Sequence, residues 1–277
     1  MKMKKKYVPV LSIAGSDSSG GAGIQADLKS FSALGCYGMT VLTATTAQNT
    51  KGVRGIHGIP VGHIIDQLDA ILDDIPPKAI KIGMLDRPEV VEALANRLKN
   101  FSIPIVFDPV MVATSGDRLI QEETIASIKE YLMPIATLLT PNLDEAALLC
   151  GFEVNSFDLM KKAGKKLFDL NNQAILIKGG HLDNEVIQDL LILKHGESFV
   201  FENSKITSKN VHGTGCSLSS AIAAELAKGE VLQEAVLKAR NYIFQAILLG
   251  RSVQIGHGNG PLNHFFNPQK QIINEVE

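Results

Sequence analysis

The sequence carries little net charge, because its 277 residues include 27 Lys and Arg against 29 Asp and Glu. Proteins that bind nucleic acid or an anionic membrane through a broad surface usually have a clear basic excess, so neither partner is expected. Charged residues make up only 20% of the chain and hydrophobic residues 45%. This balance excludes disorder over most of the length and is enough for a sizeable core.

Cysteine is scarce, and long hydrophobic runs are absent from the sequence. The three cysteines, Cys36, Cys150 and Cys216, are widely spaced, which favours neither a disulfide framework nor a zinc site. No apolar stretch reaches the roughly 18 residues of a membrane span. The apolar run after the basic residues 1–6 lacks a signal-peptide cleavage site. We therefore expect a cytoplasmic protein.

Short apolar segments typical of buried strands alternate with longer segments whose apolar residues recur at helical spacing. The expected strands are residues 8–14, 38–46, 79–83, 103–107, 135–140 and 173–178. The expected helices are about 21–35, 61–74, 88–99, 121–132, 156–170, 214–228 and 230–249. Two adjacent runs, Val186–Leu193 and Ser198–Phe201, predict an antiparallel hairpin.

This alternation predicts an α/β fold with a mostly parallel central sheet. Strands that are apolar on both faces and joined by helices need helices on both sides, and the hairpin would add an antiparallel edge. No repeat or linker rich in Pro, Gly or Ser divides the chain. We therefore expect a single domain over residues 1–277, with a basic tail at 1–6 and a polar tail at about 267–277.

Glycine and polar residues gather where the expected strands end. In open parallel sheets, ligands bind at the carboxyl ends of the strands, where loops carry the chemistry. Such an arrangement predicts an enzyme cleft rather than a scaffold. The clusters are residues 15–23, 48–50, 83–84, 108–111, 140–142, 178–181 and 212–216.

The first glycine cluster fits two phosphate-binding motifs only in part. Residues 15–20 have the glycine spacing of a P-loop, but the lysine that this motif requires is absent. Residues 21–26 match a dinucleotide-binding fingerprint, yet no acidic residue lies between Asp27 and Asp66 to hold a ribose. The cluster is better explained as a loop of small residues that lets the backbone approach a ligand closely.

The last glycine cluster, His212–Cys216, comes directly before a helical run. Glycines at a helix start expose unpaired backbone N–H groups, and the helix dipole adds positive potential, so the cluster predicts an anion site. A cysteine in this first turn should have a lowered pKa. The alternative is a small-residue helix start with an inert buried thiol, and the cluster alone leaves both open.

Asn142 and Glu145 lie three residues apart at the start of another helix, so both side chains can face one site. An amide and a carboxylate in this arrangement could orient a hydrated Mg²⁺ that screens phosphates. The same pair could form a capping box, which is purely structural. Taken alone, the capping box is the better interpretation.

Seven segments, in order, resemble the ribokinase superfamily and, within it, the hydroxymethylpyrimidine/phosphomethylpyrimidine kinases of thiamine biosynthesis. The resemblance runs from about residue 8 to about residue 265. It implies a ribokinase-like fold, ATP and Mg²⁺ as cofactors, a small-molecule substrate and a homodimer. The segments are Ala14–Lys29, Ala47–Thr50, Lys81–Leu85, Asp108–Met111, Thr140–Glu145, Lys178–His181 and His212–Cys216.

The resemblance also implies roles for single residues. Gly213, Thr214 and Gly215 correspond to the anion hole for the transferred phosphoryl group, and Lys178 to a contact with nucleotide phosphate. Cys216 stands where most of the superfamily has an Asp as catalytic base. The implied ATP-binding residues are Asn142, Lys178, His212 and Thr214, and the implied metal-binding residues are Glu145 and Asp108. The implied substrate-binding residues are Gln48, Gly15, Ala22, Asp27, Met84 and Val110.

The implied substrate is 4-amino-5-hydroxymethyl-2-methylpyrimidine, phosphorylated first on its alcohol and then as its monophosphate. The amide of Gln48 can donate to a ring nitrogen and accept from an exocyclic amine, which suits an aminopyrimidine better than a pyridine phenol. A pyridoxine or pyridoxal kinase remains the alternative, because its substrate is also a small flat ring with a hydroxymethyl group. A non-catalytic protein that binds a vitamin precursor is disfavoured, because it would not need Asn142, Glu145 and Lys178.

Overall fold

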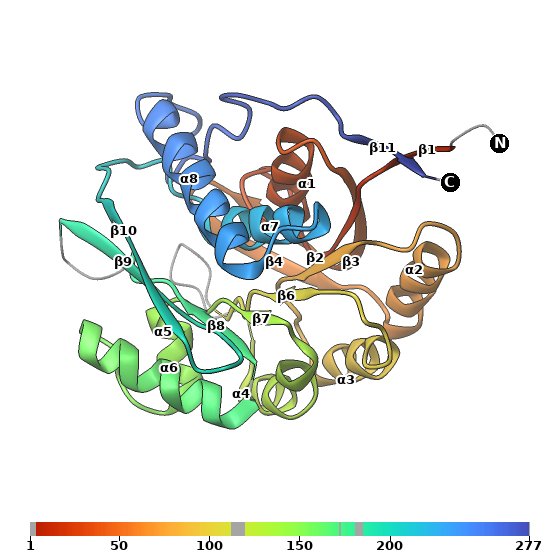
Figure 1. Ribbon diagram of the computed structural model, residues 1–277, viewed down its shortest axis with the longest axis horizontal. Coiled ribbons are helices and arrows are strands. Elements are labelled where there is room, and N and C mark those ends of the chain that lie inside the picture. Colours follow the sequence, from red (N-terminus) through yellow and green to blue (C-terminus); the bar gives the residue numbers. More distant parts are fainter. Residues whose placement is uncertain (1–3, 112–119, 172, 181–184, 277) are drawn as a thin grey trace.

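The computed structural model describes residues 4–111, 120–171, 173–180 and 185–276, and within them nine strands form one sheet (Figure 1). The strand order is β10-β9-β8-β7-β6-β5-β2-β3-β4. The strands are β2 (Pro9–Asp17), β3 (Tyr37–Asn49), β4 (Gly52–Gly58), β5 (Ala79–Ile82), β6 (Ile105–Phe107), β7 (Leu138–Leu139), β8 (Ala174–Ile177), β9 (Val186–Ile192) and β10 (Ser198–Ser204).

The sheet is parallel in its middle and antiparallel at both edges. Strands β3, β2, β5, β6, β7 and β8 pair in parallel. The hairpin β9–β10 adds one antiparallel edge, which confirms the fold that the sequence predicts. The opposite edge, β4, was not predicted, because its residues are mostly exposed and include three glycines.

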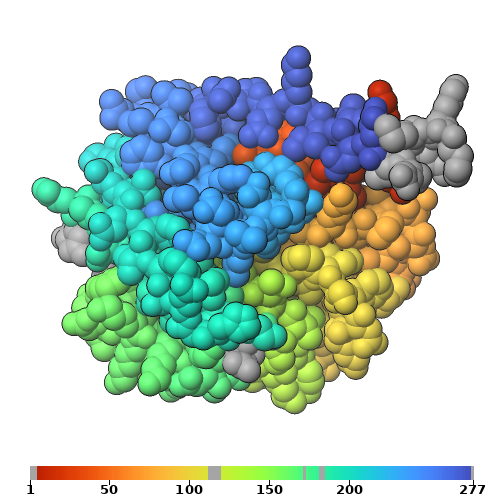
Figure 2. All heavy atoms as spheres, viewed as in Figure 1, coloured from red at the N-terminus to blue at the C-terminus, as the bar shows by residue number. Residues whose placement is uncertain are grey.

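Helices cover both faces of the sheet because its central strands are apolar on both faces. On one face lie α1 (Gly23–Ala33), α7 (Thr214–Ala227) and α8 (Leu232–Gly250). Side chains of the α7 and α8 region, in blue, cover the middle of the molecule in the view of Figure 2. On the other face lie α2 (Val61–Asp74), α3 (Pro88–Leu98), α4 (Glu122–Ser127), α5 (Leu143–Cys150) and α6 (Phe157–Asn171).

Strand β8 shows how one short segment serves both layers. Ile175 and Ile177 point into the core beneath α5 and α6, whereas Ala174 and Leu176 belong to the core beneath α7 and α8. All four residues are buried. The alternation follows from the two-residue period of a strand, and Lys178 comes directly after this strand.

The helix expected at 121–132 is shorter and less regular than predicted. Helix α4 ends at Ser127, a π-type turn spans Ile128–Leu132, and a 3₁₀ turn spans Met133–Ile135. Pro134 cannot donate a backbone hydrogen bond and its ring clashes with the preceding turn, which explains why the regular helix does not run on to β7. None of the described helices is both long and apolar enough to cross a membrane.

The terminal segments that were expected to be tails pair with each other. Strand β1 (Lys4–Tyr7) and strand β11 (Ile273–Val276) form a separate antiparallel pair. Tyr7 stacks on Tyr37 at the start of β3, with ring centroids 5.9 Å apart. The prediction of two tails rested on the charge and polarity of these segments, which indicate neither the backbone pairing nor the aromatic contact. Together they fasten the described chain ends beside the main sheet.

Candidate active site

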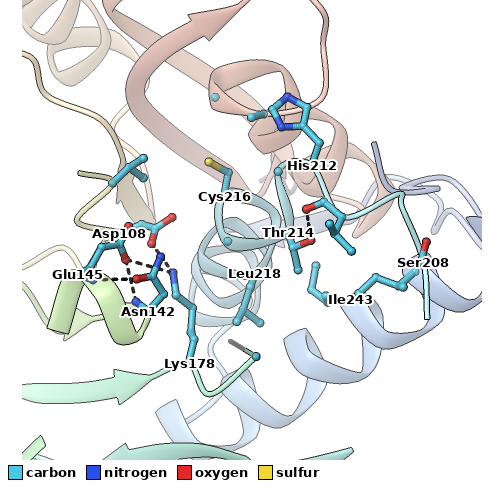
Figure 3. Close-up of a pocket in the computed structure, with 18 of the residues that line it drawn as sticks. Asp108, Asn142, Glu145, Lys178, Ser208, His212, Thr214, Cys216, Leu218 and Ile243 are labelled. Carbon is cyan, nitrogen blue, oxygen red and sulfur yellow. Dashed lines mark hydrogen bonds and ion pairs between the residues drawn. The ribbon is translucent and has the colours of Figure 1, made fainter. Parts of the chain in front are cut away.

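The carboxyl ends of the parallel strands open into one cavity of about 740 Å³. Each of the predicted strand-end clusters contributes at least one residue to its wall. Figure 3 shows Asp108, Asn142, Glu145 and Lys178 on one side and the start of α7, with Cys216, facing them. The structure therefore brings together the clusters that the sequence places far apart; His181 of one of them lies outside the described residues.

Lys178 lies between two buried carboxylates. Its Nζ atom donates to Oδ1 of Asp108 at 2.8 Å and lies 3.9 Å from Oε2 of Glu145. Asp108 follows β6 and Lys178 follows β8, two strands that flank β7. Burial acts to lower the pKa of Lys178, but Asp108 and Glu145 outweigh it and raise this pKa above its ordinary value. The lysine therefore remains a cation in the middle of the cavity.

Asn142 and Glu145 form the capping box that the sequence allows. Oδ1 of Asn142 accepts from the Glu145 N–H at 2.8 Å, and Oε2 of Glu145 accepts from the Asn142 N–H at 2.8 Å. Both residues also line the cavity, so the cap orients a carboxylate towards it. Burial raises the pKa of Glu145 well above its ordinary value of 4.5, with Lys178 opposing and Asp108 adding to the rise.

Asp108 and Glu145 are the carboxylates that a divalent cation would use here. Among the described residues, no group of three or more His, Cys, Asp or Glu side chains could enclose a metal ion. Mg²⁺ usually keeps several waters and binds through one or two carboxylates together with substrate phosphates. The residues present therefore fit a Mg²⁺ that binds along with phosphates, and not an ion held in a protein cage.

The start of α7 presents free backbone donors to the cavity. Gly213 precedes the helix with φ of +80°, and a Cβ atom there would lie 1.9 Å from the carbonyl oxygen of Gly21. The Thr214 and Ser217 N–H groups bond to Val211 and Gly213. Those of Gly215 and Cys216 have no acceptor within the described part of the chain. Two free donors at a helix N-terminus are suited to bind a phosphoryl group.

Lys178 also reaches this helix start. A Cβ atom at Gly215 would lie 3.3 Å from Nζ of Lys178 and 3.7 Å from Oδ2 of Asp108. The missing side chain therefore lets the ammonium group approach the anion site closely. Backbone donors, a lysine and two carboxylates converge on one part of the cavity.

The predicted lowering of the Cys216 pKa is wrong for this structure. Burial raises the pKa of the thiol to about 11; Lys81 opposes the rise, whereas Asp27 and Asp108 add to it. The position at a helix N-terminus, on which the prediction rested, does not overcome burial beside two carboxylates. Cys216 nevertheless lines the cavity next to the anion site.

Asp27 does not line the cavity in the described structure, although it was expected to bind substrate. It is fully buried, and its carboxylate accepts from Lys81 Nζ at 2.9 Å, Ser12 Oγ at 2.5 Å and Ser220 Oγ at 2.7 Å. Lys81, which does line the cavity, was not singled out from the sequence. The signal that could have found it is a lysine in the otherwise apolar strand β5.

Lys81 is fully buried and stays charged. Burial acts to lower its pKa, but the carboxylate of Asp27 outweighs burial and raises the pKa above its ordinary value. Asp27 therefore acts on the cavity through Lys81, and Lys81 places a second cation beside Cys216.

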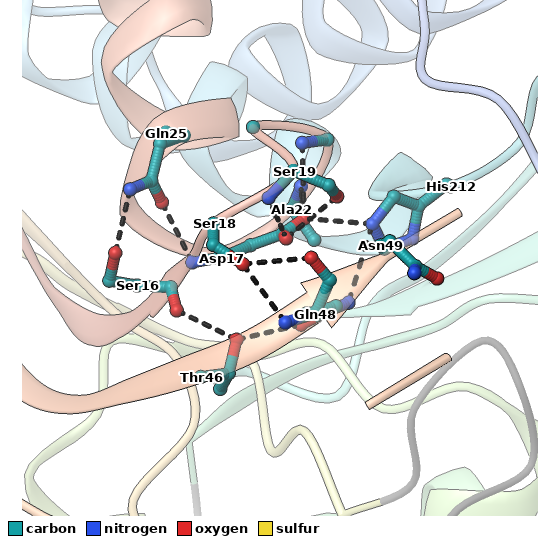
Figure 4. A network of polar contacts seen from close by, with 12 residues as sticks. Ser16, Asp17, Ser18, Ser19, Ala22, Gln25, Thr46, Gln48, Asn49 and His212 are labelled. Carbon is teal, nitrogen blue, oxygen red and sulfur yellow. Dashed lines mark hydrogen bonds and ion pairs between the residues drawn. The ribbon is translucent and has the colours of Figure 1, made fainter. Parts of the chain in front are cut away.

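The other predicted substrate-binding residues, Gln48, Gly15, Ala22, Met84 and Val110, all line the cavity. The amide of Gln48 is held at Oε1, which accepts from Thr46 Oγ1 at 3.1 Å; its Nε2 lies 3.4 Å from Nε2 of His212, a nitrogen that is already bonded to Asp17 (Figure 4). An amide at the cavity wall with one edge fixed can present its remaining donor and acceptor capacity to a ring.

His212 acts as a hydrogen-bonding loop residue. Its Nε2 lies 2.8 Å from Oδ2 of Asp17, and this carboxylate also accepts from the N–H groups of Gly21 and Ala22 (Figure 4). Burial acts to raise the pKa of Asp17, but the hydrogen bonds from His212 and Ser19 hold it below its ordinary value. The anionic Asp17 thus ties the loop at 15–23 to the start of α7.

A second wall of the cavity was not predicted. It combines the end of β10 with apolar side chains of α7 and α8, and one buried ion pair in which Arg240 Nε donates to Asp189 Oδ2 at 2.7 Å. Because helical apolar residues usually belong to the core, no sequence signal separates those that face a ligand. The wall residues include Asn203, Ser204, Ile206, Thr207, Ser208, Val211, Leu218, Ile243, Phe244 and Ile247.

An open α/β sheet with this cavity, a free helix start and a lysine between two carboxylates defines a small-molecule phosphotransferase. The model of the phosphomethylpyrimidine kinase family matches residues 17–263, and the chain belongs to this family. It is 47% identical over 257 residues to the hydroxymethylpyrimidine/phosphomethylpyrimidine kinase of Rhizobium meliloti, covering 92% of this chain and 96% of that protein. It is 48% identical over 257 residues, 92% of this chain, to the thiamine biosynthesis bifunctional protein ThiED of Geobacter sulfurreducens, of which the match covers 52%.

Two solved structures are similar along most of the chain. The phosphomethylpyrimidine kinase of Clostridium difficile has a TM-score of 0.76 and 44% identity, covering 86% of this chain and 99% of that one. An ADP complex of Bacillus subtilis pyridoxal kinase has a TM-score of 0.86 and 38% identity, covering 94% of this chain and 98% of that one. These similarities confirm the ribokinase-like fold and a kinase activity.

Proposed function

We propose that the protein uses ATP to phosphorylate 4-amino-5-hydroxymethyl-2-methylpyrimidine, and then its monophosphate to the diphosphate, in thiamine biosynthesis. The observation that carries the proposal is that the Gln48 amide opens into the same cavity as Lys178 and the start of α7. Groups suited to recognise a ring therefore share one chamber with groups suited to receive a phosphoryl group. The names of the two relatives support the same substrate and pathway.

Phosphoryl transfer needs positioning and charge stabilisation more than covalent help from the protein. Lys178 and the free N–H groups of Gly215 and Cys216 would contact the oxygens of the transferred group, where negative charge develops. When bound, Mg²⁺ would supply further charge neutralisation on the phosphates, and Asp108 and Glu145 would hold it. Asn142 would act by fixing Glu145 through the capping box.

The acceptor ring would lie against Gly15, Ala22, Met84 and Val110, with Gln48 hydrogen-bonded to its aminopyrimidine edge. Cys216 would then lie between the ring and the anion site, where it would remove the proton of the hydroxymethyl group through the small thiolate fraction that a pKa of about 11 leaves. Lys81 supports this role because its positive charge favours the thiolate. Thr214 and the wall at the end of β10 would contact ATP, whereas His212, which the resemblance implies as an ATP contact, lies 3.4 Å from the Gln48 amide and would face the ring.

A pyridoxal kinase activity is the second candidate, because the Bacillus subtilis neighbour carries that name and has the higher TM-score of the two solved structures. The Gln48 amide favours the aminopyrimidine, since it matches a donor and an acceptor on the ring edge at once. The homodimer implied by the resemblance and the cytoplasmic location expected from the sequence remain predictions.

Product analysis tests the proposed function. Purified protein, incubated with excess ATP, Mg²⁺ and the pyrimidine alcohol, should form the monophosphate and then the diphosphate, as identified by mass spectrometry. Absence of any phosphorylated pyrimidine, with ATP consumed only when pyridoxine is present, would establish the second candidate instead. Formation of the monophosphate alone would refute the second phosphorylation step.

A further inference from the structure

The turn between β3 and β4, which follows Gln48, is fastened to a segment near the end of the chain. The Asn259 N–H donates to the Thr50 carbonyl oxygen at 2.9 Å, and the Gly258 N–H donates to Thr50 Oγ1 at 3.1 Å. Thr50 and Gly258 are 208 positions apart in the sequence. These two bonds lie outside the pairing of the sheet, so they fix the turn independently of it.

The contact leaves no room for a side chain. A Cβ atom at Gly258 would lie 1.9 Å from the Thr50 carbonyl oxygen, and one at Gly256 would lie 2.5 Å from Thr50 Oγ1. The atom met at Gly258 belongs to the backbone and cannot rotate away. Any larger residue at 258 must therefore push the turn and the segment apart.

The segment at 256–260 and the chain just before it are bonded to residues 209–212. The His212 N–H donates to the Gly260 carbonyl oxygen at 3.0 Å, and the Gly260 N–H donates to Lys209 at 3.1 Å. Buried Asn210 donates to the carbonyl oxygens of Gly250 and Val253, both at 2.6 Å. A side chain at 258 would therefore separate the turn from this segment.

Gln48 lies two residues before Thr50, at an irregularity in the pairing of β3 with β4. Such irregularities re-aim side chains, so the holding of the turn adds to the bonds with Ser18 and Thr46 in setting the direction of the Gln48 amide. The same segment at 256–260 also bonds to the backbone of His212, whose ring lies 3.4 Å from the Gln48 amide. The segment at 256–260 is therefore bonded both to the turn after Gln48 and to the backbone of His212.

We propose that residues 256–260, here called the glycine clamp, are positioning residues that set the spacing between Gln48 and His212, and with it the fit of the substrate ring. The inference rests on the proposed function, in which Gln48 recognises the ring. The clamp acts through Gln48, so its loss should weaken ring binding while leaving phosphoryl transfer and ATP binding intact.

Steady-state kinetics of four variants test the clamp. Gly258→Ala should raise the KM for the ring substrate about tenfold, roughly 1.4 kcal/mol of binding free energy, because the added Cβ would lie 1.9 Å from the Thr50 carbonyl oxygen and must displace the turn. Thr50→Val, which removes the hydrogen bond from the Gly258 N–H, should raise this KM about fivefold. Thr50→Ser, which keeps the hydroxyl group, should have the wild-type KM. Gly55→Ala is the matched control, since this glycine lies on β4 and has no atom within 4 Å of an added Cβ.

The kcat and the KM for ATP should stay within about twofold of the wild type in all four variants. A ring KM within twofold of the wild type in both Gly258→Ala and Thr50→Val would overturn the clamp, and so would an equal rise in the KM for ATP. The KM is measured with whichever ring alcohol the wild-type enzyme phosphorylates more efficiently. A wild-type preference for pyridoxine would then refute the proposed function while still testing the clamp.

Discussion

The Nζ atom of Lys178 lies 2.8 Å from Oδ1 of Asp108, although the two residues are 70 positions apart in the sequence. The pairing results from short parallel strands that end side by side, β6 before Asp108 and β8 before Lys178, with β7 between them. It leaves the ammonium group 3.3 Å from where a Cβ of Gly215 would be, at the anion site of α7. The ion pair thus places a cation where the transferred phosphoryl group is expected.

Replacing Lys178 with Met should lower kcat about 10²–10³-fold, the usual effect of losing one preorganised donor to developing charge. The KM for the ring substrate should change little, because Gln48 lies elsewhere in the cavity. Lys161→Met is the control: this lysine is exposed and contacts only its helix neighbours Asp158 and Phe157 among the described residues, so kcat should not change. A kcat for Lys178→Met within threefold of the wild type would contradict the role given to Lys178.

Cys216 provides a test that combines mutation with pH. Replacement by Ala should reduce turnover about 10²–10⁴-fold, as expected for loss of a general base, and alter ring binding far less. Because burial raises the pKa of the thiol to about 11, only a small fraction is thiolate at neutral pH. The wild-type kcat should therefore rise steadily from pH 7 to pH 9, and the residual activity of Cys216→Ala should not. Near-normal turnover in Cys216→Ala would assign the thiol a packing role only.

Glu145 should make the folded protein less stable as pH rises. Its pKa in the folded state is raised, mainly by burial, above the ordinary value of 4.5. Its contribution is therefore fully present below pH 4.5 and is lost as the pH rises through the raised folded-state pKa. Glu145→Gln, which mimics the neutral acid, should melt roughly 2–4 °C above the wild type at pH 8 and close to it at pH 5.

Thermal unfolding at the two pH values measures this difference, with exposed Glu153→Gln as the control. The stabilised Glu145→Gln protein should nevertheless lose activity, because it lacks a carboxylate for Mg²⁺. A Glu145→Gln variant that melts below the wild type at pH 8 would show that the charged carboxylate is stabilising, contrary to the effect expected from its burial.

The effects of replacing Lys81 and Asp27 on the free energy of unfolding should be far from additive. Lys81→Met alone leaves Asp27 as an uncompensated buried charge and should cost about 3–5 kcal/mol of unfolding free energy. Adding Asp27→Asn removes that charge, and Ser12 and Ser220 can still bond to the amide, so the double variant should regain part of the loss. Denaturant unfolding of the two single variants and the double variant measures the coupling. Additive losses would show that the two side chains act independently.

The fold and most of the site could be predicted because they depend on local patterns. Apolar runs of strand length gave the sheet, and the glycine and polar clusters at strand ends, such as Gly213–Gly215, gave the cavity wall. The lysine in the apolar strand β5 marks Lys81 as unusual, but its pairing with Asp27 could not be predicted, because it is a contact between distant segments. The pKa of Cys216 was predicted with the wrong sign for the same reason: burial and two carboxylates from other elements outweigh the helix terminus.

Strand β4, at one edge of the main sheet, and the strand pair outside this sheet were also not predicted from the sequence. Strand β4 is mostly exposed and contains three glycines, and β1 and β11 are short and lie outside the main sheet, so their pairing leaves little hydrophobic pattern. The clamp at 256–260 depends on backbone contacts with Thr50, which no pattern of side chains records.

The ratio of kcat/KM for the pyrimidine alcohol to kcat/KM for pyridoxine, measured on the wild-type protein at equal ATP and Mg²⁺, tests the central claim most directly. A site whose amide matches the aminopyrimidine edge should prefer the pyrimidine at least about tenfold, because the other ring leaves part of that amide unpaired. A ratio below one would contradict the assignment and make the protein a vitamin B6 kinase.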